Sequence, residues 1–280
     1  MSPAAAAALH ALLGSGPGPR DIVPPLWHWL YFLEWLPPAL LAADGHPLGG
    51  GAAPPLTDRR RMFAGGRIRI NAPLLFGEPA ERTSTLSNTE IKHGRTGEML
   101  LVTVRTEVVQ RQRICVVEEQ DLIYRSGPPT AGSQPMSASQ PPATPTADRS
   151  VPRRTRFQAD PVTLFRFSAL TANCHRIHYD LPYAQNVEGY PGLVVHGPLL
   201  ALAMAEQLRT HPSGRAVSSM RYRFRQPLFG GERASITADE APSRTEFAVL
   251  GPDDTVRATA VAQYAQAGSP EPATTTGDTQ

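Results

Sequence analysis

The sequence has very little lysine, little cysteine and little net charge. Only one of its 27 basic residues is a lysine, Lys92, so the remaining 26 are arginines. With 25 acidic residues the formal net charge is +2, and such a balance lacks the strongly basic surface typical of nucleic-acid-binding proteins. We therefore expect no nucleic-acid partner. The many planar guanidinium groups suit phosphate or carboxylate ligands.

The two cysteines, Cys115 and Cys174, lie far apart and lack the spacing of metal ligands. Isolated thiols are typical of a reducing compartment, and the N-terminus lacks the basic and apolar regions of a signal peptide. The apolar stretch 22–43 approaches membrane-spanning length, but it contains His28, Glu34 and four prolines, which a lipid-facing helix rarely accepts. We expect a cytoplasmic protein in which this stretch forms a buried helix.

Proline is in excess, with 29 among 280 residues, about twice its usual share. Seven prolines fall within residues 126–152, where small and polar residues prevail and only two charges occur. This composition is typical of a linker, and residues 268–280 have the composition of a disordered tail. The sequence therefore predicts two units, residues 1–125 and 153–267, joined by the linker.

Each half combines an apolar helical segment with runs of alternating, β-branched residues. Residues 26–36 are expected to form a helix bracketed by proline pairs, and residues 197–208 a helix that opens with Gly197 and Pro198. A further helix over 160–172 begins with an Asp-Pro pair. The expected strands are residues 66–70, 81–86, 99–109, 114–124, 216–224, 233–238, 244–250 and 255–264, with a turn at 92–97. The pattern predicts an α+β arrangement built twice.

The densest group of reactive side chains lies in a loop that follows a helical pattern, where function is often located. It comprises Asn173, Cys174, His175, Arg176, His178, Tyr179 and Asp180. A zinc site needs three or four ligands with supporting contacts, and the spacing of His175, His178 and His196 is generic, so we expect no metal. Adjacent cysteine and histidine residues also make a poor nucleophile–base pair. A polar surface loop is the alternative interpretation.

Two other features suit an anionic or developing oxyanion ligand. The helix that starts at Gly197 presents free N–H groups and a positive dipole end, although a plain strand-to-helix turn would look the same. On a strand, Arg221, Arg223 and Arg225 share one face, while the two aromatic residues between them share the other. Three guanidinium groups in a row suit the phosphates of coenzyme A, and a solvated strand face is the alternative.

Residues 167–180 and 188–199 together resemble the MaoC-like double hot-dog acyl dehydratases. Within them, the chain resembles the branch of mesaconyl-CoA and itaconyl-CoA hydratases and of fungal-type and mitochondrial 3-hydroxyacyl-thioester dehydratases. Residues 27–32 and 221–229 fit the same branch, so the resemblance covers most of the chain outside the linker and tail. It implies two tandem hot-dog units, each a long helix wrapped by an antiparallel sheet, with a degenerate first unit that shapes the substrate site. It also implies a homodimer.

The activity implied by the resemblance is the reversible hydration of an enoyl-CoA, with no cofactor because coenzyme A is part of the substrate. In typical members an Asp and a His five residues later act on the catalytic water. Here His178 occupies the His position, but Asn173 replaces the Asp, and an amide cannot accept a proton. His178 is therefore the candidate base, Asn173 an orienting group and Gly197 the donor to the thioester carbonyl. The source of the proton for C2 stays open among the same His178 after a change of roles, Tyr179, Asp180 and a water.

We favour itaconyl-CoA or mesaconyl-CoA as the substrate, hydrated to citramalyl-CoA in C5-dicarboxylate breakdown. Arg176 is then the expected clamp for the distal carboxylate, with Tyr179 and His196 as further substrate contacts. One alternative is a 3-hydroxyacyl-thioester dehydratase of fatty-acid-type metabolism. Others are an acyl-CoA thioesterase and a non-catalytic subunit that binds acyl-CoA.

Overall fold

The computed structural model describes residues 1–14, 16–49, 52, 60–94, 97–125 and 152–265. All of the expected linker except Pro152, and the whole expected tail, lie outside these ranges. The helices and 3₁₀ turns are α1 (Pro3–Leu13), η1 (Trp27–Leu30), η2 (Pro38–Leu40), α2 (Pro161–Leu170), η3 (Arg176–His178), α3 (Leu181–Asn186) and α4 (Gly197–Arg209). The strands are β1 (Arg60–Ile70), β2 (Glu81–Gly94), β3 (Gly97–Gln110), β4 (Arg113–Arg125), β5 (Arg153–Phe157), β6 (Val217–Phe224), β7 (Ala234–Glu240), β8 (Arg244–Leu250) and β9 (Val256–Tyr264).

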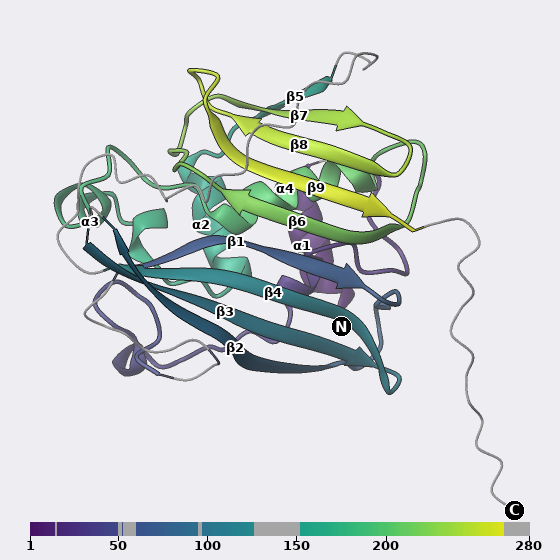
Figure 1. Cartoon of the computed structure of the whole chain (residues 1–280), viewed down its shortest axis with the longest axis horizontal. Helices are drawn as coiled ribbons and strands as arrows, with labels where there is room; N and C mark the ends of the chain where they lie inside the picture. Colours follow the sequence, from purple (N-terminus) through teal and green to yellow (C-terminus); the bar gives the residue numbers. More distant parts are fainter. Residues whose placement is uncertain (15, 50–51, 53–59, 95–96, 126–151, 266–280) are drawn as a thin grey trace, which may run out of the picture.

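The described strands form one antiparallel sheet in the order β2-β3-β4-β1-β6-β9-β8-β7-β5. The two halves of the chain meet where β1 pairs with β6, in the middle of the sheet (Figure 1). Outward from this junction the first half has the order β1-β4-β3-β2 and the second half β6-β9-β8-β7, with β5 added at the edge. The expected α+β class is therefore confirmed, and the two halves of the chain contribute similar halves of one sheet.

Helix α4 forms the core of the second half. It is buried nearly all round, and its buried residues are Leu199, Leu200, Ala201, Leu202, Ala203, Met204, Ala205, Glu206 and Leu208. It lies against β8 and β9, where Ala258, Ala260 and Ala262 point inward and are fully buried. Small side chains on the strand and on the helix let the two backbones approach closely, which is how a short sheet can wrap a single helix.

The predicted helix over residues 26–36, and with it the buried helix over 22–43, is wrong. This segment contains only the short turns η1 and η2. Leu26 and Phe32 adopt left-handed backbone conformations, with φ of 70° and 61°, which an α-helix of L-residues does not accommodate. Trp27 and Leu30 are nevertheless buried. An apolar run thus predicted burial correctly but not its secondary structure.

Local signals predicted the second half better. The side chain of Asp160 accepts a hydrogen bond from the N–H of Thr163 at 2.7 Å and caps α2, and α4 begins at Gly197 as expected. In the first half, β2 is longer than expected. Between β2 and β3 only residues 95–96 remain for the turn predicted at 92–97, and these two lie outside the described ranges.

None of the described helices has the length and hydropathy needed to cross a membrane.

Candidate active site

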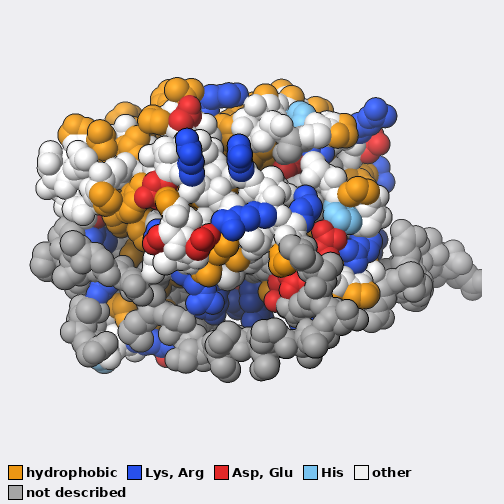
Figure 2. All heavy atoms as spheres, turned by 90° about the horizontal axis from the view of Figure 1, so that it is seen from above, with side chains coloured by type: hydrophobic (Ala, Val, Ile, Leu, Met, Phe, Trp, Pro, Cys, Tyr) orange, Lys and Arg blue, Asp and Glu red, His pale blue; other side chains and the backbone are white. Residues whose placement is uncertain are grey.

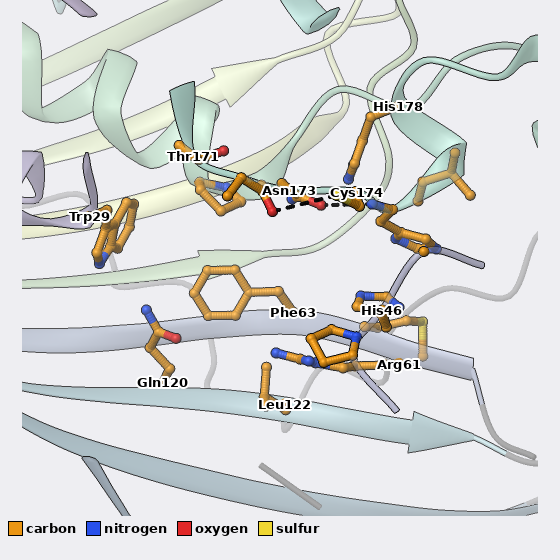
Figure 3. Close-up of a pocket in the computed structure, with 18 of the residues that line it drawn as sticks. Trp29, His46, Arg61, Phe63, Gln120, Leu122, Thr171, Asn173, Cys174 and His178 are labelled. Carbon is orange, nitrogen blue, oxygen red and sulfur yellow. Dashed lines mark hydrogen bonds between the residues drawn. The ribbon is translucent and has the colours of Figure 1, made fainter. Parts of the chain in front are cut away.

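A cavity of about 640 Å³ lies between the strands of the first half and the loop that precedes α4 (Figure 3). From the first half it is lined by Trp29, His46, Arg61, Phe63, Gln120 and Leu122, among others. From the second half it is lined by Thr171, Asn173, Cys174, His175, His178 and Gly197, among others. The cavity therefore brings three predicted site residues, Asn173, His178 and Gly197, to one place.

His178 has the geometry of a neutral base. Its ring is 7% exposed, and Nδ1 lies 2.7 Å from the carbonyl oxygen of Val194. A carbonyl only accepts, so Nδ1 carries the proton and Nε2 is left as the acceptor. Burial lowers the pKa of His178 to about 4, helped by the charge of His46 and opposed by the Val194 hydrogen bond. The ring is therefore uncharged at neutral pH and able to take a proton.

His196 supports His178 from behind. The two rings stack with centroids 3.7 Å apart and planes 18° from parallel, and Nε2 of His196 hydrogen-bonds Ser168 Oγ at 2.9 Å. His196 is fully buried and lies outside the cavity lining. The structure thus does not place His196 as the predicted substrate contact; instead its stacking fixes the plane of the candidate base.

Asn173 and Gly197 lie on the cavity as orienting groups. Asn173 Oδ1 accepts a hydrogen bond from the N–H of His175 at 3.0 Å, which leaves its NH₂ group to donate into the cavity. Gly197 is the first residue of α4, where the backbone N–H has no partner within the helix. A Cβ at Gly197 would lie 2.9 Å from the ring of Phe224, so this close approach requires glycine.

The side chains of Arg176, Tyr179 and Asp180 form hydrogen bonds that hold their own loop in place, and all three residues lie outside the cavity lining. The guanidinium of Arg176 donates to Asp180 Oδ2 at 2.8 and 3.0 Å and to the Ala43 carbonyl at 3.0 Å. Tyr179 is 44% exposed, and its hydroxyl donates to the Cys174 carbonyl at 2.9 Å. These contacts hold the loop together, so the geometry does not support Arg176 as the carboxylate clamp or Tyr179 as a substrate contact.

The predicted arginine row lies on a different face. Arg221, Arg223 and Arg225 are exposed, while Tyr222 is buried and Phe224 is half-buried, which is the alternation expected from the sequence. None of the three arginines lines the cavity as far as the structure describes it. Over the face of the molecule shown in Figure 2, basic and acidic side chains are interspersed. A role of the row in binding coenzyme A phosphates stays a prediction.

A first-half loop supplies site residues that the sequence did not reveal. Asp44 Oδ2 lies 2.8 Å from Nδ1 of His46, and Asp44 Oδ1 accepts the backbone N–H of His46 at 2.8 Å. Although burial opposes it, these hydrogen bonds and the charge of His46 hold the pKa of Asp44 well below its usual range. Asp44 is therefore an ionised carboxylate that orients the imidazole, as in other carboxylate–histidine pairs.

This loop docks directly against residues 174–176. Gly45, with φ of +93°, comes so close that a Cβ would collide with the Cys174 carbonyl oxygen, and the Arg176 N–H donates to the Asp44 carbonyl at 2.9 Å. The His46 and His175 rings lie 4.2 Å apart, and those of His175 and His178 lie 5.5 Å apart. Burial, followed by the charges of its neighbours, lowers the pKa of His175 to about 2.

The donor atoms of Asp44, His46 and His175 lie within 4.8 Å of one another. Asp44 already accepts a hydrogen bond from His46 at each carboxylate oxygen, so a metal ion would have to compete with these contacts. Zinc usually takes three or four protein ligands. The arrangement therefore fits an oriented acid–base pair better than a metal centre.

Residues 26–230 match a family model described as hydroxyacyl-thioester dehydratase type 2. A curated relative named mesaconyl-C(4)-CoA hydratase, from Chloroflexus aurantiacus, is 45% identical over 251 residues, which are 89% of this chain and 86% of the relative. The match thus spans both halves and the residues that line the cavity.

Solved structures show the same fold at low sequence identity. The Mycobacterium tuberculosis protein HtdX superposes with a TM-score of 0.65 at 19% identity, over 95% of this chain and 97% of that one. A second M. tuberculosis protein, described as having a double hotdog fold, superposes with a TM-score of 0.56 at 15% identity, over 94% and 92% of the two chains. The expected double hot-dog fold is confirmed.

Proposed function

This chain belongs to the hydroxyacyl-thioester dehydratase type 2 family and is a hydro-lyase, and from that premise we propose that it hydrates mesaconyl-C(4)-CoA to citramalyl-CoA. The observation that carries the proposal is the neutral His178 on a cavity of about 640 Å³ that two halves of the chain enclose. The substrate is supported by the name of the relative that is 45% identical. Coenzyme A enters as part of the substrate, and the proposal needs no further cofactor.

His178 takes a proton from water, and the resulting hydroxide bonds to C3 of the enoyl thioester. The electrons of the double bond move onto the thioester oxygen as an enolate. Gly197 lines the cavity at the positive end of α4. Its N–H donates a hydrogen bond to the enolate oxygen in this proposal, and such a donor stabilises the developing charge. The NH₂ group of Asn173 orients either the water or the carbonyl, in the place where typical members carry an Asp.

The proton that C2 takes up comes, in this proposal, from His46. The sequence left this donor open among His178 itself, Tyr179, Asp180 and a water. Of these side chains, Tyr179 and Asp180 do not line the cavity. His46 does line it, and Asp44 fixes the ring by its 2.8 Å hydrogen bond. His178 gains one proton and His46 loses one, so the pair must exchange a proton before the next turnover. His175 lies between them.

A substrate panel tests the proposal. Loss of the enoyl-thioester absorbance is followed with mesaconyl-C(4)-CoA, itaconyl-CoA, crotonyl-CoA and a longer enoyl-CoA, and the products are identified by mass. We expect the highest kcat/KM with mesaconyl-C(4)-CoA and a mass gain of one water. Turnover of none of the four would overturn the hydratase proposal.

The same panel separates the other candidate functions. The matched family model takes its description from hydroxyacyl-thioester dehydration, the reverse direction of the same chemistry. A preference for longer, uncharged thioesters would support that reading. Release of free coenzyme A thiol without hydration would indicate a thioesterase, and tight binding of all four without reaction would indicate a non-catalytic subunit.

A further inference from the structure

The cavity contains an arginine on the opposite side from the loop that carries Arg176. We infer that Arg61 binds a carboxylate on the acyl group and thereby selects dicarboxylic acyl-CoA thioesters over uncharged ones. The inference rests on the proposed function for its choice of a CoA thioester. It concerns a different residue and a different property, namely which acyl groups bind.

Arg61 lies beside an aromatic part of the cavity wall. It lies on β1 two residues before Phe63, so the two side chains leave the strand on the same face. The Phe63 ring contacts the rings of Trp29, Tyr222 and Phe224 at centroid distances of 6.5, 6.0 and 5.3 Å. Figure 3 shows Arg61 near His46, Phe63 and Leu122, across the cavity from His178. A guanidinium group in such surroundings favours an anionic partner because burial without one is costly.

The other charged groups of the cavity have partners. Arg82 pairs with Glu34 at 3.0 Å, and Arg60 lies 3.5 Å from Glu188. Among the remaining lining carboxylates, Asp44 binds His46. Glu118 accepts hydrogen bonds from the Trp29 indole and the Tyr222 hydroxyl and lies 2.9 Å from His28 Nε2.

Arg61 differs from all of these groups. Its side chain makes no hydrogen bond and no ion pair with any residue in the described part of the chain. Its charge nevertheless reaches both halves of the site. It contributes to the lowered pKa of His175 in the second half, and in the first half it opposes the rise that burial causes in the pKa of Tyr124. Among the described residues, the cavity therefore carries one arginine side chain without a hydrogen-bonded or ion-paired partner, next to the acid–base groups.

The chemistry of the substrate fits this position. In mesaconyl-C(4)-CoA the free carboxylate is bonded to C3, the carbon that receives the hydroxide. A group that binds this carboxylate must therefore lie in the same cavity as the base, whereas the phosphates of coenzyme A belong at the far end of the thioester arm. A planar guanidinium can hold a carboxylate through two parallel hydrogen bonds.

Two saturated thioesters isolate this contact from catalysis. Succinyl-CoA and butyryl-CoA have the same acyl length, and they differ in whether a carboxylate or a methyl group is bonded to C3. Titration calorimetry on the full-length protein should give a lower Kd for succinyl-CoA than for butyryl-CoA. In Arg61→Met, we expect Kd for succinyl-CoA to rise about 100-fold, with Kd for butyryl-CoA unchanged within about 3-fold.

Two further variants make the test specific. Arg61→Lys keeps the charge without the planar fork, so we expect an intermediate rise of about 10-fold for succinyl-CoA. Arg69→Met removes an exposed arginine from the other end of β1 and should change neither Kd. Unchanged butyryl-CoA binding also reports that the variants are folded.

Each other outcome overturns the inference in a recognisable way. An equal loss of affinity for both thioesters in Arg61→Met would place the contact on coenzyme A and not on the acyl group. An unchanged ratio of the two Kd values would remove Arg61 from recognition altogether. Neither measurement involves hydration, so a protein that fails the substrate panel but discriminates the two saturated thioesters would keep this inference and lose the proposed function.

Discussion

The two halves of the sheet have the same strand order, but a helix packs on the inner face of one half and a cavity lies against the inner face of the other. In the second half, α4 lies against β8 and β9 and is buried nearly all round. In the first half, the inner face carries Phe63, Glu118, Gln120 and Leu122, and these residues line the cavity. The segment that should have formed the matching helix contains only η1 and η2.

The absence of a central helix from the first half makes room for a ligand in a fold that is otherwise repeated. One central helix fills the space under the second sheet and provides the N-terminus at which Gly197 meets the cavity. Where the other helix is missing, the volume is shared by an irregular segment and the cavity itself. The second half thus supplies the base and the helix end, while the first half supplies the Asp44–His46 pair and Arg61.

The largest effect should come from the base in the second half. We expect His178→Ala to lower kcat by about 1,000-fold, because positioned proton transfer contributes on the order of 10²- to 10⁴-fold. The Kd for succinyl-CoA should stay within about 3-fold of the wild-type value, since the variant keeps the binding surfaces. His93→Ala, an exposed histidine on β2, is the matched control. Normal hydration by His178→Ala would contradict the site assignment.

The junction between the halves depends on a buried carboxylate. Glu118 on β4 binds the hydroxyl of Tyr222 on β6 at 3.0 Å as well as His28 and Trp29. Burial opposes ionisation, but His28 and the hydrogen bonds outweigh it and lower the pKa of Glu118. We expect Glu118→Ala to lower the free energy of unfolding by about 3 kcal/mol, measured by urea denaturation.

Glu90→Ala is the control for this variant because Glu90 is an exposed carboxylate on β2. It should stay within about 0.5 kcal/mol of the wild type. Equal stabilities for the two variants would show that the Glu118 cluster does not join the halves.

A smaller effect should follow from the acid–base pair in the first half. We expect His46→Gln to lower kcat by about 30-fold and Asp44→Asn by about 10-fold, because the first removes the donor and the second only its orientation. Asp21→Asn, which changes an exposed carboxylate of the same N-terminal region, should have no effect. Full kcat in both site variants would restrict the first half to binding and shaping the substrate.

The smallest effect concerns pH. The pKa of His178 is about 4, so the base stays unprotonated well below the usual histidine range. We expect no loss of kcat/KM between pH 7.5 and 5.5, because His178 stays unprotonated there, and a fall only as the pH approaches 4. A fall centred near pH 6.5 would show that another histidine controls the acid limb.

Stability should respond to pH before activity does. The pKa values of His178 and His175 are lower in the folded protein than their ordinary value of 6.5, so the unfolded chain binds more protons below that pH. The free energy of unfolding is therefore highest above pH 6.5 and declines as the pH falls toward 4. Urea denaturation at pH 7.5 and 5.5 separates this decline from the activity profile.

Local sequence signals were sufficient for much of the fold and part of the site. The Asp160 cap and the Gly197–Pro198 start of α4 depend on neighbouring residues, and the structure has both at the predicted positions. Alternation predicts most strands, although β1 and β2 are longer than expected and β5 is not predicted. His178, Asn173 and Gly197 lie close in sequence, and a recognisable motif contains them. The structure brings these three to the same cavity.

Contacts between distant segments could not be predicted in the same way. Asp44 and His46 lie in an irregular loop whose composition resembles that of its surroundings, and Arg61 is one of 26 arginines. Only the pairing of β1 with β6 and the close approach of Gly45 to Cys174 bring them to the cavity. The same long-range packing shows that Arg176 is engaged with Asp180.

Short-range chemistry and spacing were enough to predict the two-part α+β architecture, the loop that carries His178 and the glycine at the start of α4. Packing between distant segments fixes which half has a central helix, where the cavity opens and which charged groups face it. The physical reason is that burial constrains the apolar run of residues 26–36 without specifying a helix. Whether an arginine is paired likewise depends on carboxylates from distant segments of the chain.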